Sequence, residues 1–359
     1  MNILILDYLF PKNHVALYNN MIQYLTQVGH VKVVAKDNYY SDYKRDWIGI
    51  ELEEIPIKDD GNNMVTRKLQ SLISMIKTRK AITNNKDSIK VVLTFDTIAF
   101  ALGWLWIKSN NTFILHHKNI DELNSKIKRF LFKTYMNKVN HIVFEEFFKE
   151  YLINEIGVEE KRIHVIPHPI FSPSVSDEDN FIYDCIGLSN SNDEGFIKQI
   201  IDEEIKTNYL KNSNLHVVLR SKKYKFDNDN LKVISGYLPK EEYDYYTKKC
   251  KTVFVPLPNT FKYRVSGVIY DALSNYKVVI ANNVPIVKHY EEKYPNLCIG
   301  VNDVRGFFDK LDCIKFNTTA NKDFNEFIKH HDEKMIIKKF KDAFNCAFKD
   351  ANTNESKKE

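Results

Sequence analysis

Cysteine is scarce in this sequence, and its distribution excludes two kinds of stabilised domain. The chain has five cysteines, an odd number, and none of them shows the C-x-x-C spacing of a metal or redox motif. Scattered cysteines of this kind are typical of free thiols in a reducing compartment rather than of a disulfide framework or a zinc site. We therefore expect a cytoplasmic protein with neither disulfides nor bound zinc.

Long apolar runs and a secretory leader are also missing. No stretch reaches the roughly 18 apolar residues that a membrane-spanning helix needs. The first residues, MNILILDYLF, lack the basic leader and the cleavage site of a signal peptide, and we interpret residues 3–6 as a buried strand. A chain of 359 residues with 43% hydrophobic content is long enough for two domains, each with its own core.

Acidic residues are rare in two basic stretches. Residues 64–90 hold seven cations against Asp87 alone, and residues 126–138 hold five cations and no acid. Apolar residues lie between the cations of the second stretch, so a helix there is expected to lie on an anionic membrane surface. The alternative is a helix that packs on the core and leaves its basic face solvated. Nucleic acid is not an expected partner, because no recognised motif accompanies the charge. The cations expected at the membrane are Lys126, Lys128, Arg129 and Lys133.

Strand-like and helix-like patterns alternate along the first half of the chain. Apolar strands are expected at residues 3–6, 31–35, 91–95, 113–116, 141–144 and 163–166. Leu69, Leu72, Ile73 and Ile76 recur at helical spacing and predict one of the amphipathic helices between them. Gly29 follows the first helix, where a left-handed cap is expected. Repeated β–α–β units imply a parallel sheet with helices on both faces.

The same alternation restarts after a polar, proline-containing segment. We interpret residues 171–180 as a linker between a first domain of residues 1–170 and a second domain of residues 181–330. Residues 331–349 predict a terminal amphipathic helix, and residues 350–359 a frayed tail. The predicted fold class is α/β, with two Rossmann-like parallel-sheet domains.

The second domain contains a strand–loop–helix–strand unit that favours an anion. An apolar strand ends at residue 258, a loop carries Lys262 and Arg264, and Ser266 and Gly267 open a helix. Backbone N–H groups at a helix N-terminus and the positive end of its dipole favour phosphate. Arginine adds a planar fork that binds phosphate through two hydrogen bonds. We predict phosphate binding by this loop, with Asp271, one turn into the helix, placed to hold sugar hydroxyls.

Two further observations bear on this site. Arg220 follows an apolar strand at residues 215–219 and is the third cation that we expect to bind phosphate. The simpler interpretation is that cations in polar loops are only solvated and that Ser266 is an ordinary N-cap. Asp227 and Asp229 have D-x-D spacing but lie in a hydrophilic loop, so no metal site is expected there.

Four segments along the chain match the motifs of one enzyme family. They are residues 25–34 (LTQVGHVKVV), residues 141–169, residues 235–249 (SGYLPKEEYDYYTKK) and residues 271–281 (DALSNYKVVIA). In this order they resemble the nucleotide-sugar glycosyltransferases of the GT-B fold, in particular the group related to bacterial polysaccharide and lipid glycosyltransferases.

The chain departs from the pattern of that family at several places. Two family glutamates correspond to Tyr263 and to the shorter carboxylate of Asp271. A family glycine corresponds to Tyr276, and we expect Asn275 to take the left-handed cap in its place. The double-glycine loop after the first strand is replaced by PKNH at residues 11–14. These changes indicate a divergent branch.

The resemblance implies an activity and a site. It implies transfer of a sugar from a nucleoside diphosphate donor to a glycan or lipid-linked acceptor in cell-surface polysaccharide synthesis. This is an EC 2.4 reaction, expected to need no metal or other cofactor and to retain configuration. The two domains would face each other across a cleft, and the terminal helix would pack back across them. His117, or its neighbour His116, would lie near the donor sugar, Asp271 would accept hydrogen bonds from ribose, and His14 would approach the acceptor or transfer a proton.

Two alternatives stay open from the sequence. A non-catalytic relative that binds sugar or acts as a scaffold is motivated by Tyr263 and Asp271, and a sugar-nucleotide epimerase has the same fold. The expected partners are a nucleotide-sugar and a glycan or lipid-linked acceptor. The expected location is cytoplasmic or peripheral at the inner face of the plasma membrane.

Overall fold

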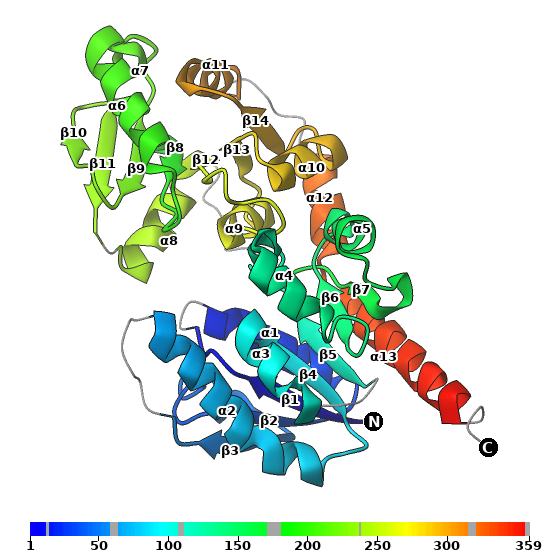
Figure 1. Ribbon diagram of the computed structural model, residues 1–359. Coiled ribbons are helices and arrows are strands. Elements are labelled where there is room, and N and C mark those ends of the chain that lie inside the picture. The colour runs from blue at the N-terminus through cyan, green and yellow to red at the C-terminus, as the bar shows by residue number, and fades with distance from the viewer. Residues whose placement is uncertain are drawn as a thin grey trace. The chain divides into compact units, whose positions relative to one another are not determined.

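Two compact α/β units make up the chain. The structure, a computed structural model, describes residues 1–11, 14–57, 64–106, 111–170, 181–236, 238–314 and 321–355. One unit consists of Met1–Pro169 with His331–Glu359, and the other of Ile170–His330 (Figure 1). The segment interpreted as a linker, residues 171–180, lies outside the described residues.

The first unit is built on a seven-stranded parallel sheet in the order β3-β2-β1-β4-β5-β6-β7. Strand order reverses between β1 and β4, and the carboxyl ends of strands beside such a switch point are where open parallel sheets bind ligands. Strand β3 is missing from the expected strands because Glu51, Glu53 and Glu54 interrupt its apolar pattern at the sheet edge. The strands are β1 (Asn2–Asp7), β2 (His30–Lys36), β3 (Ile50–Ile55), β4 (Ile89–Thr94), β5 (Thr112–Leu115), β6 (Asn140–Val143) and β7 (Ile163–Val165).

Helices cover both faces of this sheet. Right-handed crossovers between parallel strands place α2, α3 and α4 on one face and α1 on the other. Contacts of α3 with both α2 and α4 agree with this arrangement, as do contacts between α1 and α13 (Figure 1). The elements are α1 (Val15–Thr26), α2 (Met64–Asn84), α3 (Thr97–Gly103), η3 (Trp104–Trp106), η4 (Asp121–Asn124), α4 (Lys126–Lys133), α5 (Glu146–Tyr151) and α13 (Glu333–Glu355).

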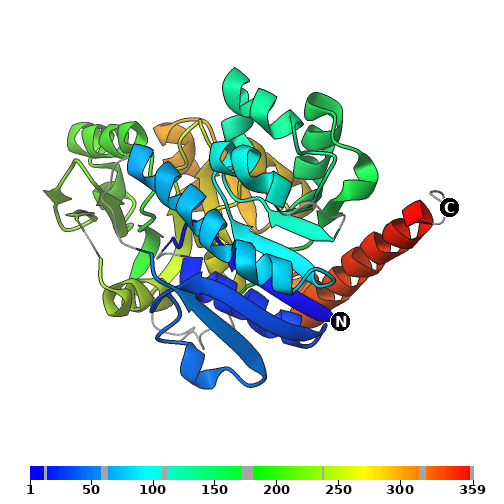
Figure 2. The same ribbon diagram turned by 60° about the horizontal axis from the view of Figure 1, so that its bottom comes forward.

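The terminal helix α13 belongs to the first unit. It contacts α1 and β7, and the ring of Phe344 lies 4.9 Å from that of Phe113, centroid to centroid. The described helix runs to Glu355 and so includes residues 350–355 of the expected tail, whereas residues 356–359 lie outside the described residues. Its C-terminal half extends beyond the sheet (Figure 2).

The second unit has a seven-stranded sheet in the order β10-β11-β9-β8-β12-β13-β14, parallel except for the β10–β11 pair. Its core includes Phe254 and Phe307, with ring centroids 4.2 Å apart. The strands are β8 (Tyr183–Gly187), β9 (Val217–Ser221), β10 (Phe226–Asp227), β11 (Leu231–Ser235), β12 (Cys250–Val255), β13 (Val278–Asn282) and β14 (Cys298–Val301). The helices are α6 (Glu194–Thr207), α7 (Tyr209–Asn212), α8 (Lys240–Lys248), α9 (Gly267–Ser274), α10 (Pro285–Lys293), α11 (Val304–Ile314) and α12 (Asn321–His330).

The C-terminus of α9 differs from the prediction. Tyr276, not Asn275, takes the left-handed conformation, with φ of 58° against −96° for Asn275. The N–H of Lys277 donates to the carbonyl of Ala272 at 2.9 Å, and the N–H of Tyr276 donates to that of Leu273 at 3.2 Å. This is a Schellman cap, and a tyrosine occupies the position that usually holds glycine.

Gly29 also has a different role from the predicted left-handed cap. Its φ is not positive, and a Cβ built on it would lie 2.3 Å from the carbonyl oxygen of Met1. The same carbonyl accepts a hydrogen bond from the N–H of His30 at 2.9 Å. Glycine is needed because the backbone that enters β2 contacts the backbone of Met1, just before β1, and leaves no room for a Cβ atom.

Two general features of the chain complete the fold. All five cysteines are free thiols, with Cys185, Cys250 and Cys298 buried. Among the described residues, no helix is both long enough and apolar enough to cross a membrane.

Candidate functional site

A buried carboxylate lies at the switch point of the first sheet. Asp7 ends β1, is 1% exposed, and accepts hydrogen bonds at Oδ1 from the N–H groups of Leu9 and Phe10, each at 3.1 Å, and from the hydroxyl of Thr94. Its Oδ2 has no hydrogen-bond partner among the described residues. Burial raises the pKa of Asp7 to about 6, although these hydrogen bonds oppose the rise. An aspartate directly after an apolar strand was a sequence signal for this residue, and the sequence analysis missed it.

The structure brings the two predicted catalytic histidines together. His14 precedes α1, and His117 follows β5 two residues after its end. The hydroxyl of Tyr18 lies 2.9 Å from His14 Nδ1 and 3.1 Å from His117 Nε2. The two imidazole rings are 5.0 Å apart, centroid to centroid. Tyr18, which lies one turn into α1 and is fully buried, is therefore a third member that the sequence analysis missed.

We assign the tautomers of this cluster from the groups around each ring nitrogen. The backbone carbonyl of Leu93 raises the pKa of His117, which is the effect of a carbonyl close to a ring N–H. Because Tyr18 occupies Nε2 of His117, the donor to Leu93 is Nδ1–H, and Nε2 is then an acceptor. Tyr18 donates its only proton to that Nε2 and so accepts from Nδ1–H of His14. The lone pair of this chain of hydrogen bonds is left on Nε2 of His14.

Both histidines are held in the neutral form. Burial lowers the pKa of His14, and the charge of Lys118 lowers it further. Burial also lowers the pKa of His117 well below its usual range, with added effects of neighbouring histidines, His14 first among them. A neutral imidazole with a free lone pair can accept a proton from a hydroxyl group. The cluster is therefore suited to act as a general base through His14.

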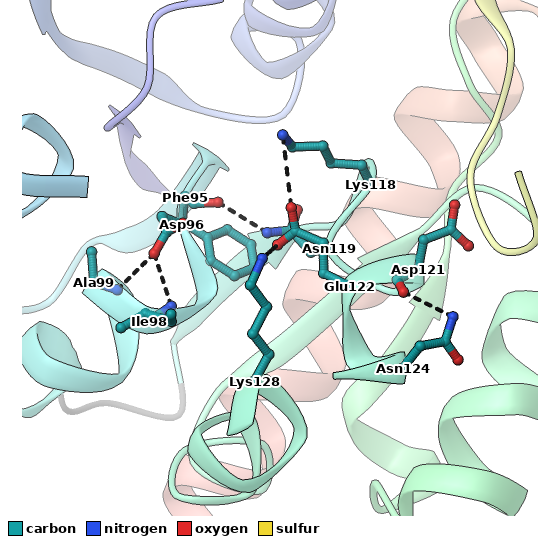
Figure 3. Close-up of polar contacts among 10 residues, drawn as sticks. All are labelled: Phe95, Asp96, Ile98, Ala99, Lys118, Asn119, Asp121, Glu122, Asn124 and Lys128. Carbon is teal, nitrogen blue, oxygen red and sulfur yellow. Dashed lines mark hydrogen bonds and ion pairs between the residues drawn. The ribbon is translucent and has the colours of Figure 1, made fainter. Parts of the chain in front are cut away.

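Polar contacts fix the loop that carries His117. The side chain of Asn119 donates from Nδ2 to the carbonyl of Phe95 at 2.9 Å, which ties the loop to the end of β4. Glu122 in η4 pairs with Lys128 at 2.7 Å and with Lys118 at 3.7 Å (Figure 3). These contacts join the loop to α4 and hold the segment that follows β5 in one position.

His116, the alternative to His117, lies inside the unit instead. It is 1% exposed, its Nε2 is 2.8 Å from Nδ1 of His141, and their rings are stacked. His141 is in turn bonded through Nε2 to the carbonyl of Met136 at 2.7 Å. His116 therefore contributes to the packing between β5 and β6, and the contact with His14 is made by His117.

In the second unit, the predicted phosphate loop leads into the N-terminus of α9. Ser266 is the N-cap, and its side chain makes no capping hydrogen bond. Gly267 is exposed, and a Cβ added there would meet nothing within 4 Å. The first turn of α9 is thus open at the position where we predict phosphate.

The three predicted cations lie at the same edge of the second sheet. The guanidinium of Arg264 lies 3.5 Å from the ring centroid of Phe261, and its Nη2 donates to Thr260 Oγ1 at 3.3 Å. Lys262 is exposed in the same loop. Arg220 lies within β9 rather than after it, and its Nε donates to the carbonyl of Gly236 at 2.8 Å. In the strand order, β8 alone separates β9 from β12, the strand that precedes the phosphate loop.

The carboxylate of Asp271 is bonded within the unit. Its Oδ2 accepts a hydrogen bond from the hydroxyl of Tyr243 in α8 at 2.8 Å, and its Oδ1 lies 3.4 Å from Nδ2 of Asn275. Burial raises the pKa of Asp271, and the bond from Tyr243 opposes the rise. A ribose would therefore share this carboxylate with Tyr243 or displace it. Among the described residues, no three histidine, cysteine, aspartate or glutamate side chains are grouped to hold a metal ion.

Comparisons with known proteins show the fold. No family model and no curated protein sequence matches the chain. A glycosyltransferase from Rickettsia africae is similar in structure, with a TM-score of 0.63 at 11% identity over 97% of this chain and 98% of that one. HepE from Anabaena, in complex with UDP and glucose, has a TM-score of 0.64 at 11% identity over 96% and 99% of the two chains.

A third similar structure is also a ligand complex. TarM from S. aureus, as a variant in complex with fondaparinux, alpha-GlcNAc-glycerol and UDP, has a TM-score of 0.54 at 17% identity over 77% of this chain and 59% of that one. The predicted fold class is confirmed: the chain has the fold of the GT-B glycosyltransferases, with two α/β units built on largely parallel sheets.

Proposed function

We propose that the protein is a glycosyltransferase of the EC 2.4 class that uses a nucleoside diphosphate sugar as donor. The observation that carries the proposal is the hydrogen-bonded cluster of His14, Tyr18 and His117 at the carboxyl edge of the first sheet. The lone pair that this assignment leaves on Nε2 of His14 suits deprotonation of an acceptor hydroxyl. The UDP bound in structures of the same fold supports the donor class.

In this proposal the second unit binds the donor. Phosphate charge that develops as the glycosidic bond breaks would be stabilised by preorganised cations and by the N–H groups at the start of α9, without a metal ion. Asp271 would hold the ribose hydroxyls once Tyr243 releases it. The donor-binding residues proposed are Arg220, Lys262, Arg264, Ser266, Gly267 and Asp271.

The first unit supplies the acceptor side. His14 is proposed as the base, and His117 as the residue that sets its tautomer through Tyr18. The acceptor is proposed to be a glycan or lipid-linked glycan of a cell-surface polysaccharide, with the enzyme in the cytoplasm at the inner face of the plasma membrane.

The stereochemistry of transfer separates two versions of the mechanism. Retention follows from the sequence resemblance alone, and a retaining attack can pass the acceptor proton directly to the departing phosphate. The free lone pair of His14 favours inversion instead, because a base on the protein then acts opposite to the leaving group. The anomeric configuration of the first product, read by proton NMR, decides between them.

The experiment that tests the function begins with titration calorimetry against UDP-, GDP- and dTDP-sugars, followed by an assay of nucleotide release with glycan and lipid extracts as acceptors. Release that depends on acceptor and persists in EDTA supports the metal-independent transferase. Binding without release on any extract favours a scaffold, and donor conversion without acceptor favours an epimerase. No binding of any nucleotide contradicts the donor site.

A further inference from the structure

The helix α2 carries an apolar stripe on its exposed face. Val65, Leu69, Ile73 and Ile76 share one stripe and are 70%, 56%, 36% and 51% exposed. An apolar stripe of this kind normally faces the core. The buried positions of the helix combine three small polar residues, Ser71, Ser74 and Thr78, with the apolar Met75, Ala81 and Ile82.

The exposed apolar surface continues over the neighbouring helices. Leu102 in α3 and Leu105 in η3 are 61% and 54% exposed, and Ile127 and Phe130 in α4 are 69% and 70% exposed. These helices lie beside one another on the same face of the sheet (Figure 1). Among the described residues of the first unit, the remaining exposed large apolar side chains are Met1 and Ile48. Exposed apolar residues are therefore concentrated on one surface, which exceeds the scatter of a normal protein exterior.

The same surface is basic. The sequence of α2 holds five lysines and arginines and that of α4 holds four, and neither helix contains an acid; α3 and η3 carry no charge. Within the predicted cations of α4, Lys128 is paired with Glu122, and Nε of Arg129 donates to the carbonyl of Leu123 at 3.0 Å. Lys126 and Lys133 are exposed.

We propose that α2, α3, η3 and α4 form one membrane-docking face, which places its apolar side chains among the headgroups of an anionic lipid bilayer. Apolar residues interleaved with cations fit such a surface, where each lysine or arginine adds favourable electrostatic energy. A second copy of the chain is a poorer occupant, because a twofold contact would place these basic helices against themselves. The proposal goes beyond the sequence prediction, which was limited to α4, and it does not depend on sugar transfer.

Vesicle flotation with the full-length protein tests this face without donor or acceptor, so its outcome is separate from that of the transferase assays. We expect binding to phosphatidylcholine vesicles that contain about a third phosphatidylglycerol, none to pure phosphatidylcholine, and weakening by salt. The double variants Leu69→Ser/Ile73→Ser and Lys126→Gln/Lys133→Gln should each reduce partitioning by about tenfold or more.

Matched variants in the second unit serve as controls. Ile182→Ser/Ile205→Ser and Lys211→Gln/Lys232→Gln change equally exposed apolar and basic residues and should bind as the wild type does. Circular dichroism confirms that each variant is folded. Absence of binding to anionic vesicles, or wild-type binding by Leu69→Ser/Ile73→Ser, overturns the proposal. The proposal is also overturned if the wild type self-associates and Leu69→Ser/Ile73→Ser abolishes that association. The face would then be assigned to a second copy of the chain.

Discussion

Tyr18 is the side chain on which the proposed base depends. Tyr18→Phe removes the hydroxyl that joins His14 to His117 but keeps the buried ring. Without it the tautomer of His14 is no longer set, so we expect kcat to fall on the order of tenfold to a hundredfold while the KM for donor stays unchanged. Steady-state kinetics checks this.

The matched control is Tyr40→Phe. Tyr40 is 1% exposed, and its hydroxyl has no hydrogen-bond partner among the described residues. Its loss should leave kcat unchanged. Equal kcat values for Tyr18→Phe and the wild type would show that the cluster is only structural.

Arg264 is the cation that we expect to contribute most to donor affinity. Its guanidinium is oriented by the ring of Phe261 and by Thr260. Arg264→Ala should weaken nucleotide binding by about 1.5–3 kcal/mol, the scale of hydrogen bonds to charged groups. Arg264→Lys should recover only part of this, because lysine cannot bind phosphate bidentately. Calorimetry measures the nucleotide affinity of both variants. Arg305→Ala, which changes an exposed arginine of the same unit, is the control. Unchanged affinity in a folded Arg264→Ala protein would exclude Arg264 from the site.

Asp7 makes the folded state less stable as pH rises, whereas an aspartate with a lowered pKa makes it more stable. Its pKa is raised from 3.8 to about 6 in the folded state, so the folded protein binds the proton more tightly than the unfolded chain. The contribution of Asp7 is fully present below pH 4 and is lost as pH rises through 6. Asn at this position does not titrate.

The stability difference between Asp7→Asn and the wild type should therefore move in favour of Asn by about 2 kcal/mol from pH 4 to pH 7. Urea unfolding at several pH values measures the stabilities of both proteins. Burial lowers the pKa of His141 to about 4 and so gives stability the opposite dependence on pH, but this contribution is common to both proteins and cancels in the difference. Asp42→Asn, at an exposed position, is the control. A difference that does not change with pH would mean that Asp7 is not desolvated.

The start of β2 depends on the close approach of Gly29 to Met1. Gly29→Ala would place a Cβ 2.3 Å from the Met1 carbonyl oxygen and disturb its hydrogen bond from His30. We expect a loss of about 1–3 kcal/mol, as for other overpacked sites. Gly306→Ala in α11 is the control, since the nearest atom there is 3.4 Å away and alanine favours the helix. Chemical denaturation compares the two, and equal stabilities would contradict the steric account.

Periodicity predicted which residues share a face but not which face is buried. Most strands of both sheets were found because their apolar runs are strong, whereas β3, β10 and β14 were not predicted, and glutamates interrupt the apolar pattern of β3. The stripe of Leu69, Ile73 and Ile76 was correctly helical, yet it lies on the surface. Sequence spacing contains no information on the serines beneath it, because their burial depends on packing against the sheet.

The candidate site shows the same limit. His14 and His117 were expected as catalytic residues from the family resemblance, but their common partner Tyr18 was not. A hydrogen bond between positions 18 and 117 depends on the order of β1, β4 and β5 in the sheet, which no local pattern encodes. The same holds for Asp271 and Tyr243, which α8 and α9 bring together.

Each unit has its own sheet and core, so we expect two unfolding transitions and a ligand effect on one of them. Trp47, Trp104 and Trp106 all lie in the first unit, so tryptophan fluorescence follows that unit alone, whereas far-ultraviolet circular dichroism follows both. A nucleoside diphosphate at about 100 times its Kd should stabilise the second unit by about 2.7 kcal/mol. The shift should appear in the dichroism and not in the fluorescence, and Arg264→Ala should reduce it. A fluorescence transition that moves equally would mean that the units unfold together or that the nucleotide binds the first unit.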